Sequence, residues 1–361
     1  MSLILGIETS CDETAAAVVE DGRNVRANIV ASQHALHERY RGVVPEIASR
    51  AHLERIAPVV REALDESGVT FRDLKAVAVG NRPGLIGSLL VGVSAAQALS
   101  WRLGKPLIGI DHVQAHLYAP NLLPVAAPDS DAPAAKPAIM YPALGLVVSG
   151  GHTSLYAMRS ATDMVRLGKT IDDAVGEAFD KAAVILGLGY PGGPAIEQEA
   201  RKGDPAAYQL PMSLLERDSL DFSFSGLKTA LLYTVRGRPK GRGRQTRFER
   251  SSDDLSDQQR CDLAAAFQCT VVETLVIKLQ RAVESLTRPG EKARSLVIGG
   301  GVSANSLLRR RVAELGEAID VPVHIPAMDY CLDNAAMIAG LGHPYHEMGA
   351  WSELDLPALA R

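Results

Sequence analysis

The chain has 361 residues, 47% hydrophobic and 22% charged, a composition typical of a folded protein with more than one domain. No apolar run approaches the roughly 20 residues that a transmembrane helix needs. The four cysteines are scattered without a CxxC pair, which favours a reduced compartment. The formal net charge of −4 gives no global attraction to nucleic acid, so any RNA binding must come from a local basic patch.

The first half of the chain alternates short apolar strands with longer helical patterns. The first strand ends in a polar turn at residues 8–14, and a Gly-rich turn later separates a strand from a helix. The predicted strands lie at 3–7, 15–19, 25–31, 76–79 and 107–110, and the predicted helices at 45–66 and 86–101.

The second half repeats this plan, with a polar turn after its own first strand. Alternating strands and helices predict an α/β fold whose mostly parallel sheets are covered by helices. The duplication resembles the actin, Hsp70 and sugar-kinase superfold, in which two lobes hold a nucleotide in a cleft. The predicted strands lie at 144–148, 154–158, 164–167, 296–298 and 321–325, and the predicted helices at 172–186, 303–319 and 334–341.

We therefore expect two lobes with two interruptions and a closing segment. One interruption is rich in Ala and Pro, and the other is a basic insertion. The expected boundaries are an N-terminal lobe at 1–124, an excursion at 125–142, a C-terminal lobe at 143–330 with its insertion at 236–252, and a closing segment at 331–361.

His112 and His116 stand four residues apart where a helix should begin, so both imidazoles project from one face and can share a divalent metal. A zinc protease of the H-E-x-x-H type has a glutamate after its first histidine. Here Val113 and then Gln114 follow, and neither can take a proton. The pattern predicts a metal site unsuited to that kind of hydrolysis, with separate capping or core contacts as the alternative. An acidic third ligand is expected, and Asp333 is a candidate that spacing alone does not select.

Two Gly-rich turns occupy matching places in the duplicated plan. The turn at 147–153 follows an apolar strand, so its free backbone N–H groups can bind a phosphate or acyl oxygen. The turn at 299–305 opens a helix, where the N-terminal dipole favours an anion. Tight turns at strand ends would explain one such motif, but two matching turns favour the binding of a nucleotide or an acyl phosphate.

Four acids follow predicted strands, and each can be a general base, a metal ligand, or only a turn or cap residue. These acids are Glu8, Asp12, Glu13 and Asp111.

Two further groups of charged or polar residues remain open. The basic stretch at 236–250 predicts either a grip on a phosphate backbone or a solvated insertion. His34, His37 and His52 surround residues 42–50, and we expect polar surface side chains there rather than ligands.

Nine stretches taken together resemble the universal tRNA threonylcarbamoyladenosine synthase family, once described as sialoglycoprotein endopeptidases. They run in order over nearly the whole chain and omit only the two interruptions and the last ten or so residues. The matching stretches are 6–14, 42–52, 112–116, 147–153, 176–181, 190–194, 221–228, 300–305 and 333–338.

The resemblance implies a reaction and a set of site residues. The threonylcarbamoyl group moves from threonylcarbamoyl-AMP to the exocyclic amine of the adenosine beside the anticodon, in tRNAs that read codons beginning with A, and AMP is released. His112, His116 and Asp333 bind one metal, with Fe²⁺ expected and Zn²⁺ possible, and we hypothesise that Asp12 or Glu13 accepts the amine proton. The implied donor pocket comprises Val147, Val148, Ser149, Gly150, Gly151, Asp180, Gly193 and Asn305.

The resemblance also implies partners and a compartment. Besides tRNA, bacterial relatives act with a shorter metal-free paralogue and a small P-loop ATPase. The charged start of the chain predicts no signal peptide, and we expect a cytoplasmic protein without membrane contact.

Three rival functions remain open. A metalloprotease would cleave peptides, but this chain lacks the glutamate that such an enzyme would need after His112. A non-catalytic nucleotide-binding module of the actin-like type would keep the Gly-rich turns without needing the metal ligands together. A carbamoyltransferase acting on a small molecule would share the metal chemistry but would not need tRNA.

Three positions depart from the family pattern. Asn81 and Arg82 precede Pro-Gly where the family has a Gly before that pair, which adds a bulky cation near the expected cleft. Leu332 replaces the usual Thr before Asp333 and removes a hydroxyl beside the expected metal ligand. Arg41 replaces a common Gly, with less expected effect.

Overall fold

The computed structural model describes the chain except residues 38–39, 41, 125–136, 214–215, 217, 242–246 and 287–291. Most of the predicted excursion at 125–142 therefore lies outside the described residues, as does Arg41. The chain forms two compact units. Unit 1 comprises Met1–Met140, Arg159–Met164 and His324–Arg361, and unit 2 comprises Tyr141–Met158 and Val165–Val323.

Unit 1 is built on a five-stranded sheet of order β3-β2-β1-β4-β5. β1 pairs antiparallel with β2 and parallel with β4, so the expectation of a mostly parallel sheet is wrong for its first three strands. Short turns join these strands, and a short turn allows only an antiparallel return. The strands are β1 (Leu3–Glu8), β2 (Glu13–Glu20), β3 (Asn24–Ser32), β4 (Ala76–Arg82) and β5 (Leu107–Asp111).

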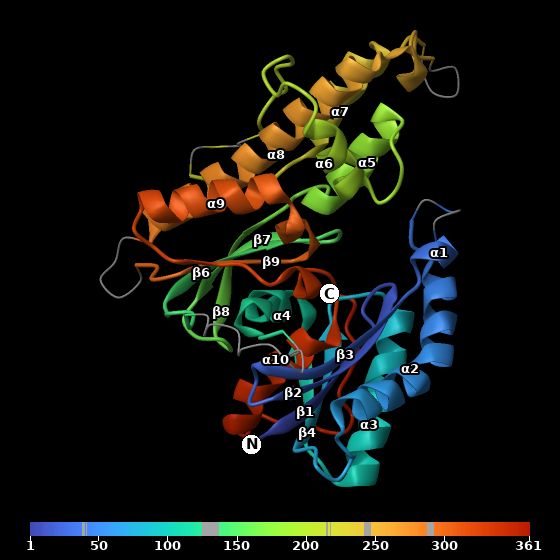
Figure 1. Cartoon of the computed structure of the whole chain (residues 1–361), viewed down its shortest axis with the longest axis vertical. Helices are drawn as coiled ribbons and strands as arrows, with labels where there is room; N and C mark the ends of the chain where they lie inside the picture. Colours follow the sequence, from blue (N-terminus) through green and yellow to red (C-terminus); the bar gives the residue numbers. More distant parts are fainter. Residues whose placement is uncertain are drawn as a thin grey trace. The chain divides into compact units, whose positions relative to one another are not determined.

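Helices cover both faces of this sheet (Figure 1). Because successive strand residues point to opposite faces, Ile4 and Leu5 belong to different cores. The first core includes α10, and the second includes α2. Glycine at position 6 permits the contact with α10, because a Cβ there would lie 2.4 Å from the Ala335 carbonyl oxygen. The helices of unit 1 are α1 (His34–His37), α2 (Pro45–Ser67), α3 (Ile86–Leu103), α4 (His112–Tyr118) and α10 (Ala335–Glu347), with 3₁₀ turns at Ala119–Asn121 and Met328–Tyr330.

The C-terminal segment after α10 covers the edge strand β5. Ser352 N–H donates to the Leu107 carbonyl, and Gly109 N–H donates to Ser352 Oγ. Asn81, which precedes the departure from the family pattern at Arg82, donates its side-chain amide to the Pro357 carbonyl at 3.0 Å. The tail therefore pairs with backbone groups that an open edge would leave free.

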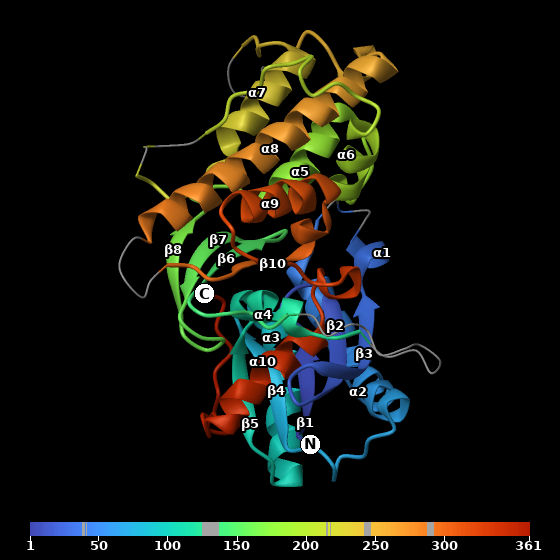
Figure 2. The same cartoon turned by 60° about the vertical axis from the view of Figure 1, so that its left-hand side comes forward.

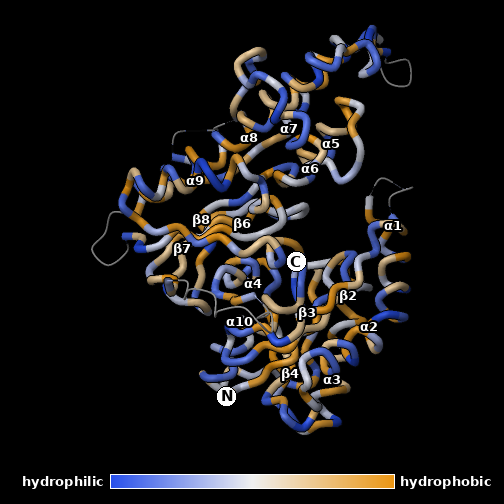
Figure 3. Tube along the Cα trace, viewed as in Figure 1, coloured by the Kyte–Doolittle hydropathy of each residue, from blue (hydrophilic) through white to orange (hydrophobic). Residues whose placement is uncertain are grey.

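Unit 2 repeats the same strand plan, with a sheet of order β10-β9-β6-β7-β8 (Figure 2). β6 pairs antiparallel with β7 and parallel with β9, as β1 does with β2 and β4. The central strands of both sheets are hydrophobic along the trace (Figure 3). The strands are β6 (Ala143–Val148), β7 (Thr153–Met158), β8 (Met164–Lys169), β9 (Leu296–Gly299) and β10 (Val323–His324).

Five helices of the described chain belong to unit 2, and two of them begin later than predicted. The helix expected from 303 begins at Ser306, because Asn305 caps it and a 3₁₀ turn precedes it. The helix expected from 172 begins at Val175. The helices are α5 (Val175–Leu186), α6 (Gly192–Ala200), α7 (Ser225–Arg236), α8 (Asp257–Ser285) and α9 (Ser306–Ala318), with 3₁₀ turns at Ser252–Asp254 and Gly301–Ala304.

No described helix combines the length and the apolarity that a bilayer span requires.

Candidate active site

The helix that carries both histidines begins directly at the end of β5. Asp111 caps it, because its side chain accepts from Val113 N–H at 3.0 Å and from Gln114 N–H at 3.2 Å. Arg82 lies 3.4 Å from the Asp111 carboxylate, so this added cation contacts the cap of α4. Asp111 therefore fixes the direction in which α4 leaves the sheet.

His112, His116 and Asp333 come together in unit 1, and they offer donor atoms that all lie within 4.8 Å of one another. Asp333 Oδ1 is 3.5 Å from His112 Nε2 and 3.1 Å from His116 Nε2. Both imidazoles are buried, with 4% and 0% of the residue exposed. Two imidazole nitrogens and a carboxylate oxygen form a donor set that suits zinc or ferrous iron.

Glu8 supports this cluster from the end of β1. Its Oε2 lies 3.0 Å from His112 Nδ1, and Ser10 Oγ lies 3.2 Å from the same nitrogen. A carboxylate on Nδ1 fixes the ring, leaving Nε2 for a metal. The neighbouring strand gives Glu8 its room, because a Cβ on Gly80 would lie 2.6 Å from Glu8 Oε2.

The hydrogen bonding of His116 indicates that the residues fit a metal. Both of its ring nitrogens are buried, and neither makes a hydrogen bond of good geometry to a described group, although Nε2 lies 3.1 Å from Asp333 Oδ1. A buried polar atom without a partner is costly, and a bound cation would remove that cost. Burial lowers the pKa of His116, which favours the neutral imidazole that a metal requires.

The protonation states of the other two ligands, Asp333 and His112, depend on the charged groups around them in the cluster. Burial opposes ionisation of Asp333, but both histidines outweigh it and hold its pKa well below the usual range. Burial likewise opposes the charge of His112, and the carboxylates of Asp333 and Glu8 outweigh it and raise its pKa. Asp333 is therefore ionised at neutral pH, as a ligand must be.

The turn after β1 brings the two candidate acid–base residues close to this cluster. Burial, Asp333 and Asp12 raise the pKa of Glu13 to about 9. Burial and the neighbouring acids also raise the pKa of the Cys11 thiol, which keeps it unreactive. The turn thus gathers carboxylates whose charges oppose one another.

In unit 2, the turn after β6 lies against the start of α5. Gly176 N–H donates to the Ser149 carbonyl at 3.1 Å, and a Cβ on Gly176 would lie 2.8 Å from Gly150 Cα. Gly150 and Gly151 are exposed, and a Cβ at either would meet nothing within 4 Å. The backbone of this turn is therefore open to a ligand.

The second Gly-rich turn of unit 2 lies beside the end of β6. Gly300 has a φ of 94°, and a Cβ there would lie 2.4 Å from the Val148 carbonyl oxygen. Only glycine tolerates both conditions. Val147 and Val148 are buried strand residues, so only their backbone can reach a ligand.

Of the other three residues expected in the donor pocket, Gly193 and Asn305 stand at helix starts and Asp180 lies within α5. Asp180 Oδ1 accepts from Gly192 N–H at 2.8 Å, and burial raises the pKa of Asp180. Gly193 lies in the first turn of α6, with open space where a Cβ would be. Asn305 caps α9, and Glu197 of α6 accepts from the backbone N–H of Ser306 at 3.2 Å. Hydrogen bonds therefore connect α6 to α5 through Asp180 and to the start of α9 through Glu197.

The basic stretch at 236–250 forms a short hairpin at the end of α7 in its described part. Lys240 and Arg247 exchange two backbone hydrogen bonds of 2.9 Å, and Lys240 also pairs with Glu249. Arg250 donates to the Thr234 carbonyl at 3.0 Å, which anchors the hairpin on the last turn of α7.

The structure tests the expectation that the histidines around residues 42–50 lie on the surface, and it shows how Leu332 is exposed. His37 and His52 are buried, with 2% and 0% exposed, so the prediction of surface residues is wrong for both. Leu332 has a side chain that points to solvent, with 67% exposed. Its hydrophobic surface therefore does not pack beside the metal ligands.

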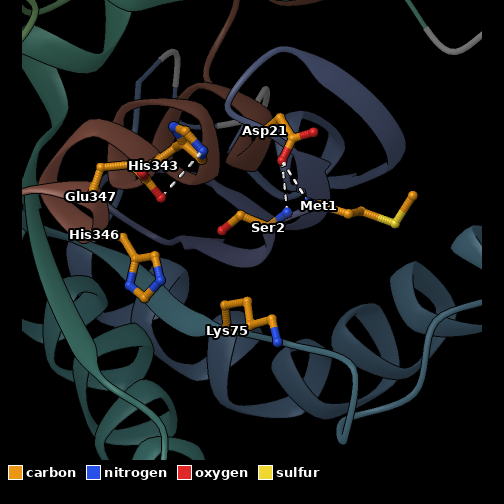
Figure 4. A pocket seen from close by; sticks show the side chains of 7 residues that line it. All are labelled: Met1, Ser2, Asp21, Lys75, His343, His346 and Glu347. Atoms are coloured by element: carbon orange, nitrogen blue, oxygen red, sulfur yellow. Dashed lines mark hydrogen bonds and ion pairs between the residues drawn. The ribbon is translucent and has the colours of Figure 1, made fainter.

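A recess of unit 1 lies at the opposite end of β1 from Glu8 (Figure 4). Ser2 N–H donates to Asp21 at 2.6 Å, and His343 lies 3.9 Å from Glu347. The N-terminus is thereby tied to the turn after β2, and ligands of such sheets bind at the carboxyl ends of the strands instead. The recess therefore belongs to the packing of the N-terminus.

Two five-stranded sheets of matching order, each with a polar turn between its antiparallel first two strands, define a duplicated α/β protein of the actin, Hsp70 and sugar-kinase class. A sequence model of the tRNA N6-adenosine threonylcarbamoyltransferase family matches residues 24–340. The chain belongs to this family.

Curated relatives agree with that placement, and solved structures share the fold. The chain is 48% identical to the tRNA N6-adenosine threonylcarbamoyltransferase of Moorella thermoacetica and 49% identical to that of Symbiobacterium thermophilum, covering 99% of this chain and 95% of each relative. Among solved structures, HypF of T. kodakarensis matches with a TM-score of 0.58 at 15% identity, over 96% of this chain and 48% of that one. The (R)-2-hydroxyglutaryl-CoA dehydratase component A of Acidaminococcus fermentans matches with a TM-score of 0.52 at 12% identity, over 96% and 100%. These two likenesses show the shared fold alone.

Proposed function

We propose that this chain transfers a threonylcarbamoyl group from threonylcarbamoyl-AMP to the exocyclic amine of the adenosine beside the anticodon. The tRNAs concerned read codons that begin with A, and AMP leaves. The observation that carries this proposal is the His112, His116 and Asp333 cluster, supported by Glu8, in a chain of the threonylcarbamoyltransferase family.

The chemistry of the two substrates explains what the site has to supply. An adenine amine is a weak nucleophile because its lone pair is delocalised into the ring, so the acyl donor must be activated. A mixed anhydride with AMP provides a good leaving group. When bound by the three ligands, a divalent metal supplies Lewis-acid polarisation of donor oxygens. Fe²⁺ is the metal we expect, with Zn²⁺ compatible with the same ligands.

The open turn of unit 2 is the proposed site for the phosphate of the donor. The backbone N–H groups of Gly150 and Gly151 are free of side-chain cover, and amides in such turns bind anions. The start of α6 at Gly193, with Asp180 on its backbone, and the cap of α9 at Asn305 border this pocket in the proposal. These residues bind and orient the donor and do not exchange protons with it.

The acids of the first turn are the proposed route for the amine proton. With a pKa raised to about 9, Glu13 holds a proton at neutral pH and acts as a hydrogen-bond donor. Asp12 is then the member of the pair that accepts the proton as the new N–C bond forms. The target base lies in a single-stranded loop, so splaying it out costs little unstacking energy.

The partners follow from the family and from the charge of the chain. We propose a shorter metal-free paralogue and a small P-loop ATPase as protein partners in the cytoplasm, as for the bacterial relatives that the motifs resemble. For tRNA, we propose that the hairpin on α7 contacts backbone phosphates. Residues 236–250 hold seven Lys and Arg against one Glu, a formal +6 within a chain of −4.

A reconstituted transfer assay tests the proposed function. Purified protein is incubated with threonylcarbamoyl-AMP and unmodified tRNA, and modified nucleosides are measured by mass spectrometry. Chelation should abolish transfer and Fe²⁺ or Zn²⁺ should restore it, while the His116→Ala variant stays inactive. His343→Ala, a half-buried histidine of α10 in the same unit, is the matched control and should transfer normally. Transfer that survives both chelation and His116→Ala would refute the metal requirement.

A further inference from the structure

Three buried polar side chains of unit 1 have no part in the metal cluster. His52 of α2, His37 of α1 and Gln33 are exposed by only 0%, 2% and 1%. Polar groups are rarely buried this fully, and when they are, they are hydrogen-bonded. Their hydrogen bonds form a chain that leads from His37 through Gln33 to His52 and ends at the turn that carries Asp12 and Glu13.

The positions of the protons in this chain of hydrogen bonds follow first from its inner end, at His52. His52 Nε2 lies 3.0 Å from the Cys11 carbonyl oxygen, and a carbonyl can only accept, so Nε2 carries the proton. Nδ1 of the neutral ring must then accept. Its one lone pair accepts Thr14 Oγ1–H at 2.8 Å, and the side-chain amide of Gln33 shares it as the weaker donor at 3.3 Å.

The outer end of the chain, at His37, leads independently to the same orientation of the Gln33 side-chain amide. Val44 N–H donates to His37 Nδ1 at 3.3 Å, so the proton of His37 is on Nε2. That nitrogen lies 3.3 Å from Gln33 Oε1 and donates to it. The amide nitrogen of Gln33 is thereby turned toward His52, as the inner end requires. Both ends therefore specify one arrangement of protons.

Three consecutive carbonyls of the turn are held in this way. Leu85 N–H donates to the Ser10 carbonyl at 2.8 Å, His52 to the Cys11 carbonyl, and Gln33 N–H to the Asp12 carbonyl at 3.0 Å. Of these three bonds, only the one to the Cys11 carbonyl has a side chain as its donor. With these peptide planes fixed, the side chains of Asp12 and Glu13 keep one direction.

The turn has a physical reason to need such support. Glu8, Asp12, Glu13 and Asp333 bring carboxylates together, and their mutual repulsion favours a turn that opens. Burial lowers the pKa of His52, so the ring stays neutral and keeps its Nδ1 as an acceptor at physiological pH. The hydrogen bond to the Cys11 carbonyl, Glu8 and Asp12 oppose that shift of the pKa, and Arg55 adds to it.

We propose that His52, oriented by Thr14 and by the Gln33–His37 pair, is a positioning residue for the transfer reaction. It holds the Cys11 carbonyl and thereby keeps the Asp12 carboxylate and the neighbouring Glu13 carboxyl where the amine proton is accepted. This inference rests on the proposed function, because it assumes that these acids act in transfer.

The kinetic test compares two substitutions of His52. His52→Leu leaves the Cys11 carbonyl without its donor, and we expect kcat to fall about 10- to 100-fold, since a misplaced group costs rate rather than binding. KM for tRNA and for the donor should stay within about two-fold, and metal content should be unchanged. His52→Gln keeps an amide donor near the Nε2 position and should restore most of kcat. Equal activity of wild type and His52→Leu, or a fall in both variants with loss of metal, would overturn the proposal.

A second measurement does not depend on how a variant folds. The ring ¹⁵N signals of His52 in the wild-type protein should show the neutral Nε2–H tautomer between about pH 6 and pH 8. An Nδ1–H tautomer would overturn the proposal. Thr14→Val, which removes one donor to Nδ1 at similar volume, should lower kcat less than His52→Leu does. The double variant Asp12→Ala, Glu13→Ala separates the two claims, because full activity there would refute the role of the acids while leaving the tautomer unchanged.

Discussion

Glu8→Gln should weaken metal binding without changing the three ligands. The substitution keeps the size of the side chain in a position where Gly80 leaves no spare room. It replaces the charged acceptor that lies 3.0 Å from His112 Nδ1 with a neutral amide. A charge-assisted hydrogen bond is about twice as strong as a neutral one, and the ring loses part of its basicity with it.

The expected loss of affinity is about 10- to 100-fold, which corresponds to about 1.4 to 2.7 kcal/mol. Zn²⁺ is a suitable probe because it has no redox chemistry, and competition with a chromophoric chelator gives its affinity. Glu62→Gln, the same chemical change at an exposed position of α2, is the control and should bind Zn²⁺ as the wild type does. If Glu8→Gln binds Zn²⁺ as tightly as the control, Glu8 does not support the cluster.

Three further predictions concern unit 2. Gly176→Ala should displace the turn at Gly150, whose Cα lies 2.8 Å from the added Cβ, and steady-state kinetics should show at least a ten-fold higher KM for the donor with a smaller change in kcat. Burial opposes ionisation of Asp172, but hydrogen bonds from two hydroxyls and an amide at the start of α7 outweigh it and lower its pKa. The stability that Asp172 contributes is therefore present above its unfolded pKa of about 3.9 and is lost as pH falls through the lower folded pKa. Denaturant titrations should find the Asp172→Asn variant less stable than wild type at pH 7. That difference in stability should shrink below about pH 4. Charge reversal at Arg238 and Arg247 should weaken tRNA binding and reduce the slope of log affinity against log salt by about 1 for each phosphate that the hairpin no longer neutralises, and an unchanged slope would place tRNA elsewhere.

The sequence predicts the histidine pair well because its geometry is local. A four-residue spacing on a helix is decided by the helix itself, and the strand before it ends in a capping acid, Asp111. Spacing cannot select Asp333, because it reaches the cluster from the far end of the chain. Only the packing of α10 on β1 at Gly6 brings it there.

The buried histidines show where sequence patterns fail. His37 and His52 stand beside charged residues, which predicts surface positions, yet tertiary contacts bury them. The partners of His52, which are Gln33, Thr14 and the Cys11 carbonyl, come from other segments, so no periodicity indicates them. A polar side chain on the apolar face of α2, whose buried positions include Ile56 and Val59, is the one signal that His52 gives.

The direction of the strands and the helix α6 illustrate other limits. Strand direction depends on the length of the connection, and the short polar turns after β1 and β2 require antiparallel pairs. The sequence pattern predicts no helix at α6, where Tyr190–Pro191 and two glycines precede and open it. Proline and glycine predict a turn there, although Asp180 holds the first N–H of that helix.

The metal cluster is tested most directly by a single-turnover comparison of Asp333→Asn with Asp329→Asn, an exposed aspartate of the same segment. Each protein is loaded with Fe²⁺ or Zn²⁺, its metal content is measured, and donor-dependent nucleoside formation is followed by mass spectrometry. We predict that Asp333→Asn holds less than one metal per chain and transfers at least 100-fold more slowly, while Asp329→Asn matches the wild type. An Asp333→Asn protein that keeps its metal and transfers at the wild-type rate would contradict this account.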